Sequence, residues 1–215
     1  MTAQPSPALT LAARGLAVWR GDRCLCRDLA FELHGGQALH LQGPNGAGKT
    51  SLIRVLTGLG RCDAGEVLWQ GEPLRRNSAG YRAALAYLGH NNGVKLGLSP
   101  RENLTAAGAL MDTPASADID KALAEVGLSE SADLLCGALS MGQRRRTALA
   151  RLQLSRAVLW FLDEPLASLD VAGAALVNRI LKTHLAAGGM VVFATHQALE
   201  LAPFPVLAVK LGTPA

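Results

Sequence analysis

Short blocks of apolar residues, separated by polar and glycine-containing turns, predict β-strands up to about residue 90. The first two blocks are separated by a turn at Gly21-Asp22, and the third runs straight into a glycine-rich loop. The strands expected in this part of the chain are residues 9–19, 29–33, 38–42, 65–71 (a strand with its turn) and 84–89.

A helical period replaces the strand pattern between about residues 92 and 156, and strands and helices then alternate again. The clearest helix start is Ser99, because this capping residue is followed by Pro100 at the first helical position and by Glu102 at the third. This order predicts an α/β core interrupted by a helical insert. The expected helices are residues 51–59 (stopped by Gly60), a helix from 99, 116–126 (ended by Gly127), 143–154 and 171–187, and the later strands are 158–162, 190–195 and 205–211.

The most apolar blocks, residues 157–162 and 190–194, are far shorter than the roughly 18–20 apolar residues that span a bilayer. We therefore interpret both as buried parallel strands. Residues 1–11 have no basic segment followed by an apolar one, so no secretory signal is expected. The chain has 215 residues, of which 49% are hydrophobic, and a mean hydropathy of +0.20, which is high for a water-soluble protein. We expect a globular, cytoplasmic protein.

Charge and cysteine content narrow the functional classes further. The formal net charge is only +4, and the cluster Arg144-Arg145-Arg146 is interpreted as a solvated helix face, because no aromatic residues are interspersed with it as in many nucleic-acid-binding surfaces. The cysteines lack zinc or haem-attachment spacing, so we expect buried or half-buried thiols in a reducing compartment at Cys24, Cys26, Cys62 and Cys136.

Phosphate binding is predicted by the motif GPNGAGKT, which lies between an apolar strand and an amphipathic helix. Its glycines allow successive backbone N–H groups to turn inward around an anion at a helix N-terminus. Lys49 is expected to reach the β- and γ-phosphates, Thr50 to bind Mg²⁺, and Ser51 to add a phosphate contact. The predicted nucleotide-binding residues here are Gly43, Pro44, Asn45, Gly46, Ala47, Gly48, Lys49, Thr50 and Ser51.

Two carboxylates, Asp163 and Glu164, follow the apolar strand 158–162. A continuously apolar strand is expected at the centre of a sheet, where carboxylates without partners are costly to bury. Asp163 is therefore predicted to hold Mg²⁺, and Glu164 to polarise an attacking water as general base. Together with the phosphate loop, this pair predicts an ATPase or a GTPase.

Between these two elements stands the segment Leu139-Ser140-Met141-Gly142-Gln143, which resembles the signature motif of the ATP-binding cassette (ABC) family. In that family the motif begins a helix whose N-terminus faces the γ-phosphate held by a second copy. A hydroxyl, a flexible backbone and a helix dipole suit an anion. The resemblance covers nearly the whole chain and implies that two copies enclose ATP and Mg²⁺, with residues 140–143 completing the partner's site.

Two more segments follow in the family's order. Ser168-Leu169-Asp170 resembles the D-loop, which implies that Asp170 lies near the nucleotide. Thr195-His196 follows the last core strand and resembles the switch region, which implies that His196 senses the γ-phosphate.

The chain departs from the family pattern at two places. Counting back from residues 101–104, the family's Q-loop glutamine falls at His90, a residue whose charge changes near neutral pH. Aligned through residues 21–23, Arg20 stands where an adenine-stacking tyrosine is expected, and Trp19 lies one residue early. Either Trp19 stacks on adenine or Arg20 makes a cation–π contact with the base.

Residues 63–74, 88–104 and 139–165 resemble, more narrowly, the ATPase subunit of the haem exporter of c-type cytochrome maturation. The resemblance implies a P-loop NTPase (RecA-like) α/β core with an N-terminal antiparallel β subdomain and an inserted helical subdomain. It implies one domain over residues 1–215, with the core at about 1–91 and 157–215 and the helical subdomain at about 92–156. It also implies an integral membrane transporter subunit as partner and a peripheral location at the cytoplasmic face of the bacterial inner membrane.

Three alternatives are open at this point. The first is a soluble ABC-type ATPase acting on ribosomes or DNA, although nucleic acid is not an expected partner because the chain has neither a second cassette nor a long coiled-coil insert. The second is an ABC ATPase that serves a different transported substrate. The third, a P-loop kinase or GTPase, lacks a guanine-reading Asn-Lys-x-Asp and leaves the signature segment unexplained.

Overall fold

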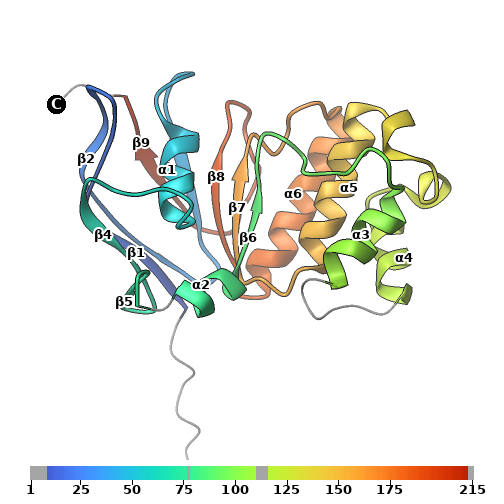
Figure 1. Ribbon diagram of the computed structural model, residues 1–215, viewed down its shortest axis with the longest axis horizontal. Coiled ribbons are helices and arrows are strands. Elements are labelled where there is room, and N and C mark those ends of the chain that lie inside the picture. Colours follow the sequence, from blue (N-terminus) through green and yellow to red (C-terminus); the bar gives the residue numbers. More distant parts are fainter. Residues whose placement is uncertain (1–8, 77, 110–115, 213–215) are drawn as a thin grey trace, which may run out of the picture.

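The computed structural model describes residues 9–76, 78–109 and 116–212, which form two sheets and a group of helices (Figure 1). The strands are β1 (Thr10–Arg20), β2 (Arg23–His34), β3 (Ala38–Gln42), β4 (Ala64–Trp69), β5 (Glu72–Pro73), β6 (Leu85–Leu88), β7 (Leu159–Asp163), β8 (Met190–Ala194) and β9 (Val206–Lys210). The helices are α1 (Lys49–Leu56), α2 (Ser78–Ala84), α3 (Pro100–Ala109), α4 (Ser116–Glu125), α5 (Met141–Leu154) and α6 (Val171–Ala186).

The first sheet is antiparallel, with the strand order β2-β1-β4-β5. Strands β1 and β2 form the predicted hairpin, which closes at Gly21 in a left-handed conformation (φ 59°). The two-residue strand β5 was not predicted, because it is too short to carry an apolar period. This sheet is the predicted N-terminal antiparallel β subdomain.

The second sheet is parallel throughout, with the order β6-β7-β8-β3-β9. All residues of β7 and β8 are buried, which confirms the interpretation of the two apolar blocks as central parallel strands. Because the strands are parallel, the segments that follow β3, β7 and β8 leave the sheet at the same edge. These segments are the phosphate loop, the segment that begins at Glu164 directly after Asp163 (the last residue of β7), and the Thr195-His196 pair.

The parallel sheet is covered on both faces, and successive residues of β7 point to opposite sides of it. Leu159 and Phe161 belong to the core shared with α1 and the antiparallel sheet, whereas Trp160 and Leu162 belong to the core shared with α5 and α6. Figure 1 shows α1 between the two sheets and α5 and α6 on the other side of the parallel sheet. The layers confirm an α/β core with helices on both faces.

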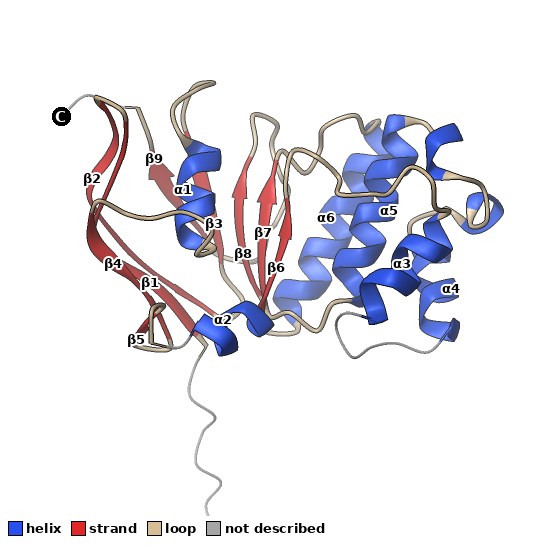
Figure 2. Ribbon diagram, viewed as in Figure 1, coloured by secondary structure: helices blue, strands red, loops and turns tan. Residues whose placement is uncertain are grey.

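The helical insert gathers α3, α4 and α5 at one end of the molecule, away from the antiparallel sheet (Figure 2). The start of α3 is capped as predicted, since the Ser99 N–H donates to Glu102 Oε2 (2.8 Å) and the Glu102 N–H donates to Ser99 Oγ (3.2 Å). None of the helices in the described parts of the chain has both the length and the apolar character needed to cross a membrane.

Two sequence-based expectations about local structure were wrong. The helix expected over residues 51–59 ends at Leu56, because Gly58 adopts a left-handed conformation (φ 76°) and leaves Leu59 64% exposed. The arginine cluster 144–146 is not a uniformly solvated face, because Arg145 is only 1% exposed. The four cysteines are free thiols, buried at Cys136 and half-buried at the other three positions, as expected.

A histidine lies inside the second core. The ring of His184 on α6 stacks on Trp160 of β7, with the ring centroids 3.7 Å apart and the planes 11° from parallel. Gly189 leaves room for this ring, because a Cβ atom there would lie 2.2 Å from Nε2 of the histidine. Burial lowers the pKa of His184 to about 4, so the ring is neutral in the folded protein at neutral pH.

We expect His184 to make the free energy of unfolding depend on pH. Between its ordinary pKa of 6.5 and about 4, the unfolded chain protonates this ring and the folded chain does not, so the unfolded state binds more protons. The contribution is therefore present above pH 6.5 and is lost progressively as the pH falls towards 4.

The variant His184→Phe keeps an aromatic ring against Trp160 but binds no proton. Urea unfolding at pH 7.5 and pH 5.5 should show that this variant loses about 1 kcal/mol less stability between the two conditions than the wild type does. Equal losses in the two proteins would contradict the assignment of a neutral, buried His184.

Candidate active site

The phosphate loop passes from β3 into α1 through glycines in positive-φ conformations: Gly43 (148°), Gly46 (75°) and Gly48 (102°). A Cβ atom on Gly48 would also lie 2.8 Å from the side chain of Leu25, so only glycine fits there. Helix α1 has no side-chain cap and no acidic residue in its first turn. Its first N–H groups are therefore available to an anion.

Lys49 lies across the mouth of this loop and is only 8% exposed. Its ammonium donates to the carbonyl oxygens of Gly43 (2.7 Å) and Pro44 (3.1 Å) and lies 3.1 Å from Nε2 of His196. The ammonium of Lys49, at the end of the loop, is thus held against the first two residues of the loop. An ammonium in this position can neutralise charge on a terminal phosphate.

Thr50 and Asp163 meet beneath the loop, where the Thr50 hydroxyl donates to Asp163 Oδ2 at 2.6 Å. Asp163 is 3% exposed and lies at the end of β7. A hydroxyl and a carboxylate are oxygen ligands of the type that Mg²⁺ prefers, so this pair fits the predicted metal role. In the described segments of the chain, no group of three or more His, Cys, Asp or Glu side chains forms a metal cluster of its own.

Glu164 occupies a left-handed conformation (φ 50°), which is uncommon for a residue with a side chain. Its N–H donates to the carbonyl of Ala194 (2.8 Å) and so continues the pairing of β7 with β8. Its Oε1 lies 3.5 Å from Nε2 of His196. Lys49 and Glu164 therefore approach the same histidine ring nitrogen, from the phosphate loop and from the end of β7.

The signature residues form the start of α5 on the other side of the parallel sheet from α1 (Figure 1). Ser140 caps this helix: its Oγ accepts from the Gln143 N–H (3.1 Å), and the Gln143 side chain accepts from the Ser140 N–H (2.9 Å). Met141 is 56% exposed at the same helix end. Although both segments lie in the described part of the chain, no hydrogen bond joins residues 140–143 to residues 43–51.

The D-loop segment packs against the signature helix. A Cβ atom on Gly142 would lie 3.0 Å from the carbonyl oxygen of Ser168, which itself has a φ of 64°. Asp170 caps α6 by accepting from the Gly173 N–H (2.8 Å), and its Oδ1 lies 3.5 Å from Arg146. The structure thus gives Asp170 a local capping role and places it beside the signature helix.

The two candidates for adenine contact lie at the end of the β1–β2 hairpin, next to Leu25, which touches Gly48. Trp19 is 38% exposed, and the guanidinium of Arg27 lies 5.6 Å from its ring centroid. Arg20 is exposed beside it. The hairpin end is therefore close to the phosphate loop, and Trp19 already has a cation over its ring.

His90 is exposed on the segment that leaves β6, one residue after Gly89. Leu88 pairs with Leu162, so this segment leaves the sheet at the same edge as Asp163 and Glu164. The histidine therefore belongs to the edge of the sheet that carries the candidate site.

Two residues near the site were missed by sequence reasoning. His40 in the middle of β3 stacks on Phe193 (4.5 Å between centroids) and lies 3.3 Å from the carbonyl of Thr195, and burial lowers its pKa. A polar residue within an apolar strand was the available signal. Arg145 contacts the segment after β7, and its position three and four residues before the buried Ala148 and Leu149 could have indicated an inward-facing side chain.

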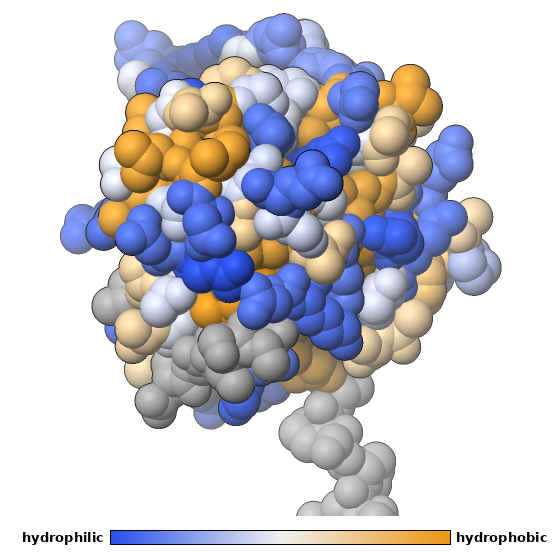
Figure 3. All heavy atoms as spheres, turned by 90° about the vertical axis from the view of Figure 1, so that its right-hand side faces the viewer, coloured by the Kyte–Doolittle hydropathy of each residue, from blue (hydrophilic) through white to orange (hydrophobic). Residues whose placement is uncertain are grey.

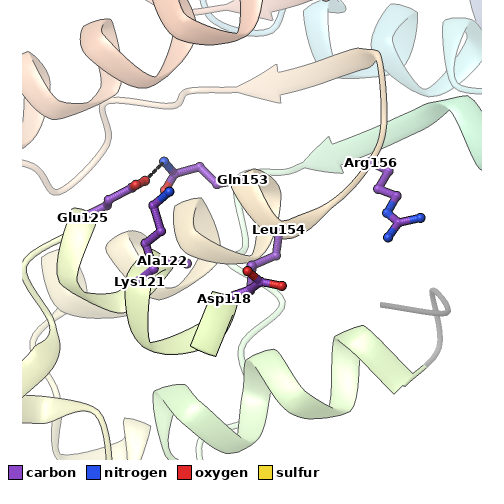
Figure 4. Close-up of a pocket in the computed structure, with 7 residues that line it drawn as sticks. All are labelled: Asp118, Lys121, Ala122, Glu125, Gln153, Leu154 and Arg156. Atoms are coloured by element: carbon purple, nitrogen blue, oxygen red, sulfur yellow. Dashed lines mark hydrogen bonds between the residues drawn. The ribbon is translucent and has the colours of Figure 1, made fainter. Parts of the chain in front are cut away.

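A separate polar pocket of about 290 Å³ lies between α4 and the end of α5 (Figure 4). The Gln153 side-chain amide donates to Glu125 Oε2 at 2.9 Å, so two of the polar side chains that line the pocket form a hydrogen bond with each other. None of the predicted site residues lines this pocket, and we assign no function to it. Its lining residues are Asp118, Lys121, Ala122, Glu125, Gln153, Leu154 and Arg156.

Comparisons with known proteins identify relatives along nearly the whole chain. Residues 26–167 match the ABC transporter family. The chain is 48% identical over 204 residues to the cytochrome c biogenesis ATP-binding export protein CcmA of Dechloromonas aromatica, covering 94% of this chain and 100% of that protein. It is 45% identical to the protein of the same name from Nitrosomonas europaea, covering 96% and 97% of the two chains.

Solved structures agree on the fold. A putative ABC transporter ATP-binding protein from Pyrococcus furiosus superposes with a TM-score of 0.82 at 24% identity, over 94% of this chain and 97% of that one. A bacterial Atm1-family ABC exporter with ATP bound gives a TM-score of 0.82 at 20% identity, over 96% of this chain and 38% of that one. The predicted P-loop NTPase fold and the family resemblance are confirmed.

The phosphate loop, the carboxylates after β7 and these matches agree with one another. The chain belongs to the ABC transporter family of ATP-binding proteins and, within it, to the cytochrome c biogenesis ATP-binding export proteins.

Proposed function

We propose that this protein is the ATP-hydrolysing subunit of the haem exporter of c-type cytochrome biogenesis, acting as one ATPase domain over residues 1–215. The observation that carries the ATPase role is the meeting of Lys49, Glu164 and His196 at the carboxyl edge of the parallel sheet. The names of the 48% and 45% identical relatives support the cytochrome c pathway.

The proposed reaction is attack of water on the γ-phosphorus of ATP with release of ADP. Glu164 accepts a proton from the water as the new P–O bond forms, since its carboxylate lies at the rim of the phosphate loop. Lys49 and His196 stabilise the charge on the γ-phosphate. Thr50 and Asp163 would hold Mg²⁺, which neutralises charge on the β- and γ-phosphate oxygens when it is bound.

A second copy supplies the other half of each site in this proposal. Residues 140–143 lie on the opposite face of the sheet from α1, so they do not reach the phosphate loop of their own chain. The N-terminus of α5 is exposed at Met141, and in the proposed dimer its first N–H groups would face an anion held by the second copy. Two facing copies would place Ser140 and Gly142 of each chain against the ATP held by the other.

We propose that the membrane partner docks on the helical insert around residues 90–104. The carbonyl of Leu96 accepts from the Gly137 N–H (2.9 Å), so this segment lies beside residues 134–137. Leu96, Leu134 and Leu135 are 52%, 54% and 56% exposed, and we call them the insert patch. Figure 3 shows apolar areas among charged ones on this end of the molecule. Clustered apolar side chains of this kind suit a protein partner.

The variant Glu164→Gln tests the general base. We expect it to bind ATP but to turn over roughly 10² to 10⁴-fold more slowly, the usual scale for loss of general acid–base catalysis. Because the ATP-bound state would persist, size-exclusion chromatography with ATP should show a dimer. Turnover near the wild-type rate, with monomeric elution, would remove Glu164 from this role.

Mixing two inactive variants tests the facing copies. Lys49→Ala disables the phosphate loop and Ser140→Arg disables the signature helix, so each heterodimer has one site with both lesions and one site with neither. We expect ATPase activity to return in the mixture, and the wild-type rate to rise faster than linearly with protein concentration. No recovery, once heterodimers are demonstrated, would contradict composite sites.

Docking and pathway can be tested in a host that lacks its own copy. The chain should sediment with inner membranes only when the matching membrane subunit is present, and Leu134→Asp should reduce this sedimentation. Val206→Asp is the matched control, because Val206 is also exposed (46%) but lies on β9 away from the insert.

The same host separates docking from hydrolysis. Lys49→Ala should still sediment with membranes, yet holocytochrome c should fall while b-type haem proteins stay normal. Normal holocytochrome c in cells whose only copy is Lys49→Ala would reject the haem-pathway assignment and favour another transported substrate.

A further inference from the structure

Arg145, on the second turn of α5, is a buried guanidinium that the proposed reaction does not use. The residue is 1% exposed, although transfer of an unpaired charge out of water is strongly unfavourable. In the described part of the chain, no carboxylate lies within ion-pairing distance of it. The carboxylates of Asp163 and Glu164 are near enough to favour its charge, but neither pairs with it directly, so its hydrogen bonds must account for the rest.

Neutral oxygens from two segments surround the guanidinium and accept all of its hydrogen bonds. One segment is the turn after β7 and the other is the segment that follows β6. The acceptors are the carbonyls of Asp163 (3.1 Å), Glu164 (2.7 Å), Pro165 (3.3 Å) and Gly89 (2.9 Å), and the side-chain oxygen of Asn92 (2.9 Å). The planar fork of an arginine can serve these directions at once, whereas a lysine ammonium cannot.

The shortest of these bonds goes to the carbonyl of Glu164, the residue with the left-handed backbone. Such a conformation is unfavourable for a residue with a side chain and persists only where the surroundings enforce it. The Glu164 N–H is held by Ala194, and the Glu164 carbonyl by Arg145. Both peptide groups that flank the Cα atom are thereby held, which fixes the direction in which the side chain leaves the backbone; from there its carboxylate reaches to 3.5 Å from His196.

Burial lowers the pKa of Arg145 to about 10, so the guanidinium stays charged at neutral pH and keeps all its donors. Charge-assisted hydrogen bonds to carbonyl oxygens are stronger than neutral ones. The remaining donors bind the segment 89–92, which contains His90. The contacts thus join the signature helix, the candidate base and the His90 segment.

We propose that Arg145 is a positioning residue for hydrolysis: its hydrogen bonds hold Glu164 in the left-handed turn that aims the carboxylate at the phosphate loop, and they tie the His90 segment to that turn. The proposal deepens the proposed ATPase function and rests on it, because it takes Glu164 as the general base.

Arg151, farther along α5, provides a matched control. It is also partly buried, and burial lowers its pKa. It donates to the carbonyls of Asn92 (2.9 Å) and Gly93 (2.7 Å) and so anchors the same segment after β6, whereas no hydrogen bond joins it to residues 163–165, which are all described. Loss of Arg151 therefore removes one anchor of that segment and leaves the hydrogen bonds of Arg145 to Glu164 and to the same segment in place.

The experiment compares steady-state ATPase kinetics and equilibrium ATP binding for Arg145→Gln, Arg145→Lys and Arg151→Gln. We expect Arg145→Gln to lower kcat by about 10²-fold, because small misplacements of a catalytic group have effects of this size, while the Kd for ATP changes less than about threefold. Arg145→Lys should restore little activity, and Arg151→Gln should keep kcat within about threefold of the wild type. A wild-type kcat in Arg145→Gln would overturn the proposal.

A double-mutant cycle distinguishes positioning from general loss of structure. If Arg145 acts through Glu164, then adding Arg145→Gln to Glu164→Gln should lower kcat by less than about threefold more. Full additivity of the two losses would mean that Arg145 does not act through Glu164. If thermal melting shows that Arg145→Gln is unfolded, the same cycle with Arg145→Lys, which retains the charge, decides the question.

The outcome for Glu164→Gln alone distinguishes failure of the proposed hydrolysis mechanism from failure of the positioning role of Arg145. Wild-type turnover in that variant would reject the proposed mechanism itself. Slow turnover in Glu164→Gln together with a wild-type kcat in both Arg145 variants would reject only the positioning role.

Discussion

Parallel pairing of β3, β7 and β8 is the constraint on which the candidate site depends. Leu41 and Asp163 both pair with Ala194 at the end of β8, so the three strands end at the same level. The phosphate loop, Glu164 and His196 start within two residues of that level and therefore meet. The register is enforced by fully buried strands, because a shift by one residue would turn Asp163 and the apolar side chains to the wrong faces.

Two non-glycine residues with left-handed backbones lie beside the catalytic candidates, and two others, Asp28 and Gln70, lie in the antiparallel sheet and its turn. Glu164 and Ser168 adopt left-handed conformations although neither is glycine, and both lie in the short connection between β7 and α6. The buried guanidinium of Arg145 and the pairing with β8 stabilise the first of these turns. This arrangement is typical of functional sites, where surrounding contacts compensate for a strained geometry that orients a reactive group.

The layered arrangement that assembles the phosphate-binding half of the site also keeps the signature residues of the same chain away from it. Helix α1 and the phosphate loop lie on one face of the parallel sheet, and α5 with Ser140 lies on the other. One chain therefore exposes the N-terminus of α5, for which we propose anion binding, while its own phosphate loop lacks that contact. This separation supports the proposed dimer, and the position of Arg145 on α5 links the outward-facing helix end to Glu164 within each chain.

Apolar periodicity and motif spacing alone determined the α/β class, the order of the main strands and helices, and the phosphate loop with Asp163-Glu164. These properties depend on local backbone preferences and on which face each residue buries. Tertiary structure decided the properties that depend on contacts between residues far apart in the sequence. Two of these are the burial of Arg145, which was predicted to lie on a solvated helix face, and the neutral state of His184 against Trp160. It also decided the approach of Lys49 and Glu164 to His196. Local pattern could have indicated that Arg145 faces inward, but it cannot specify the partners in any of these contacts, because each contact joins residues far apart in the sequence.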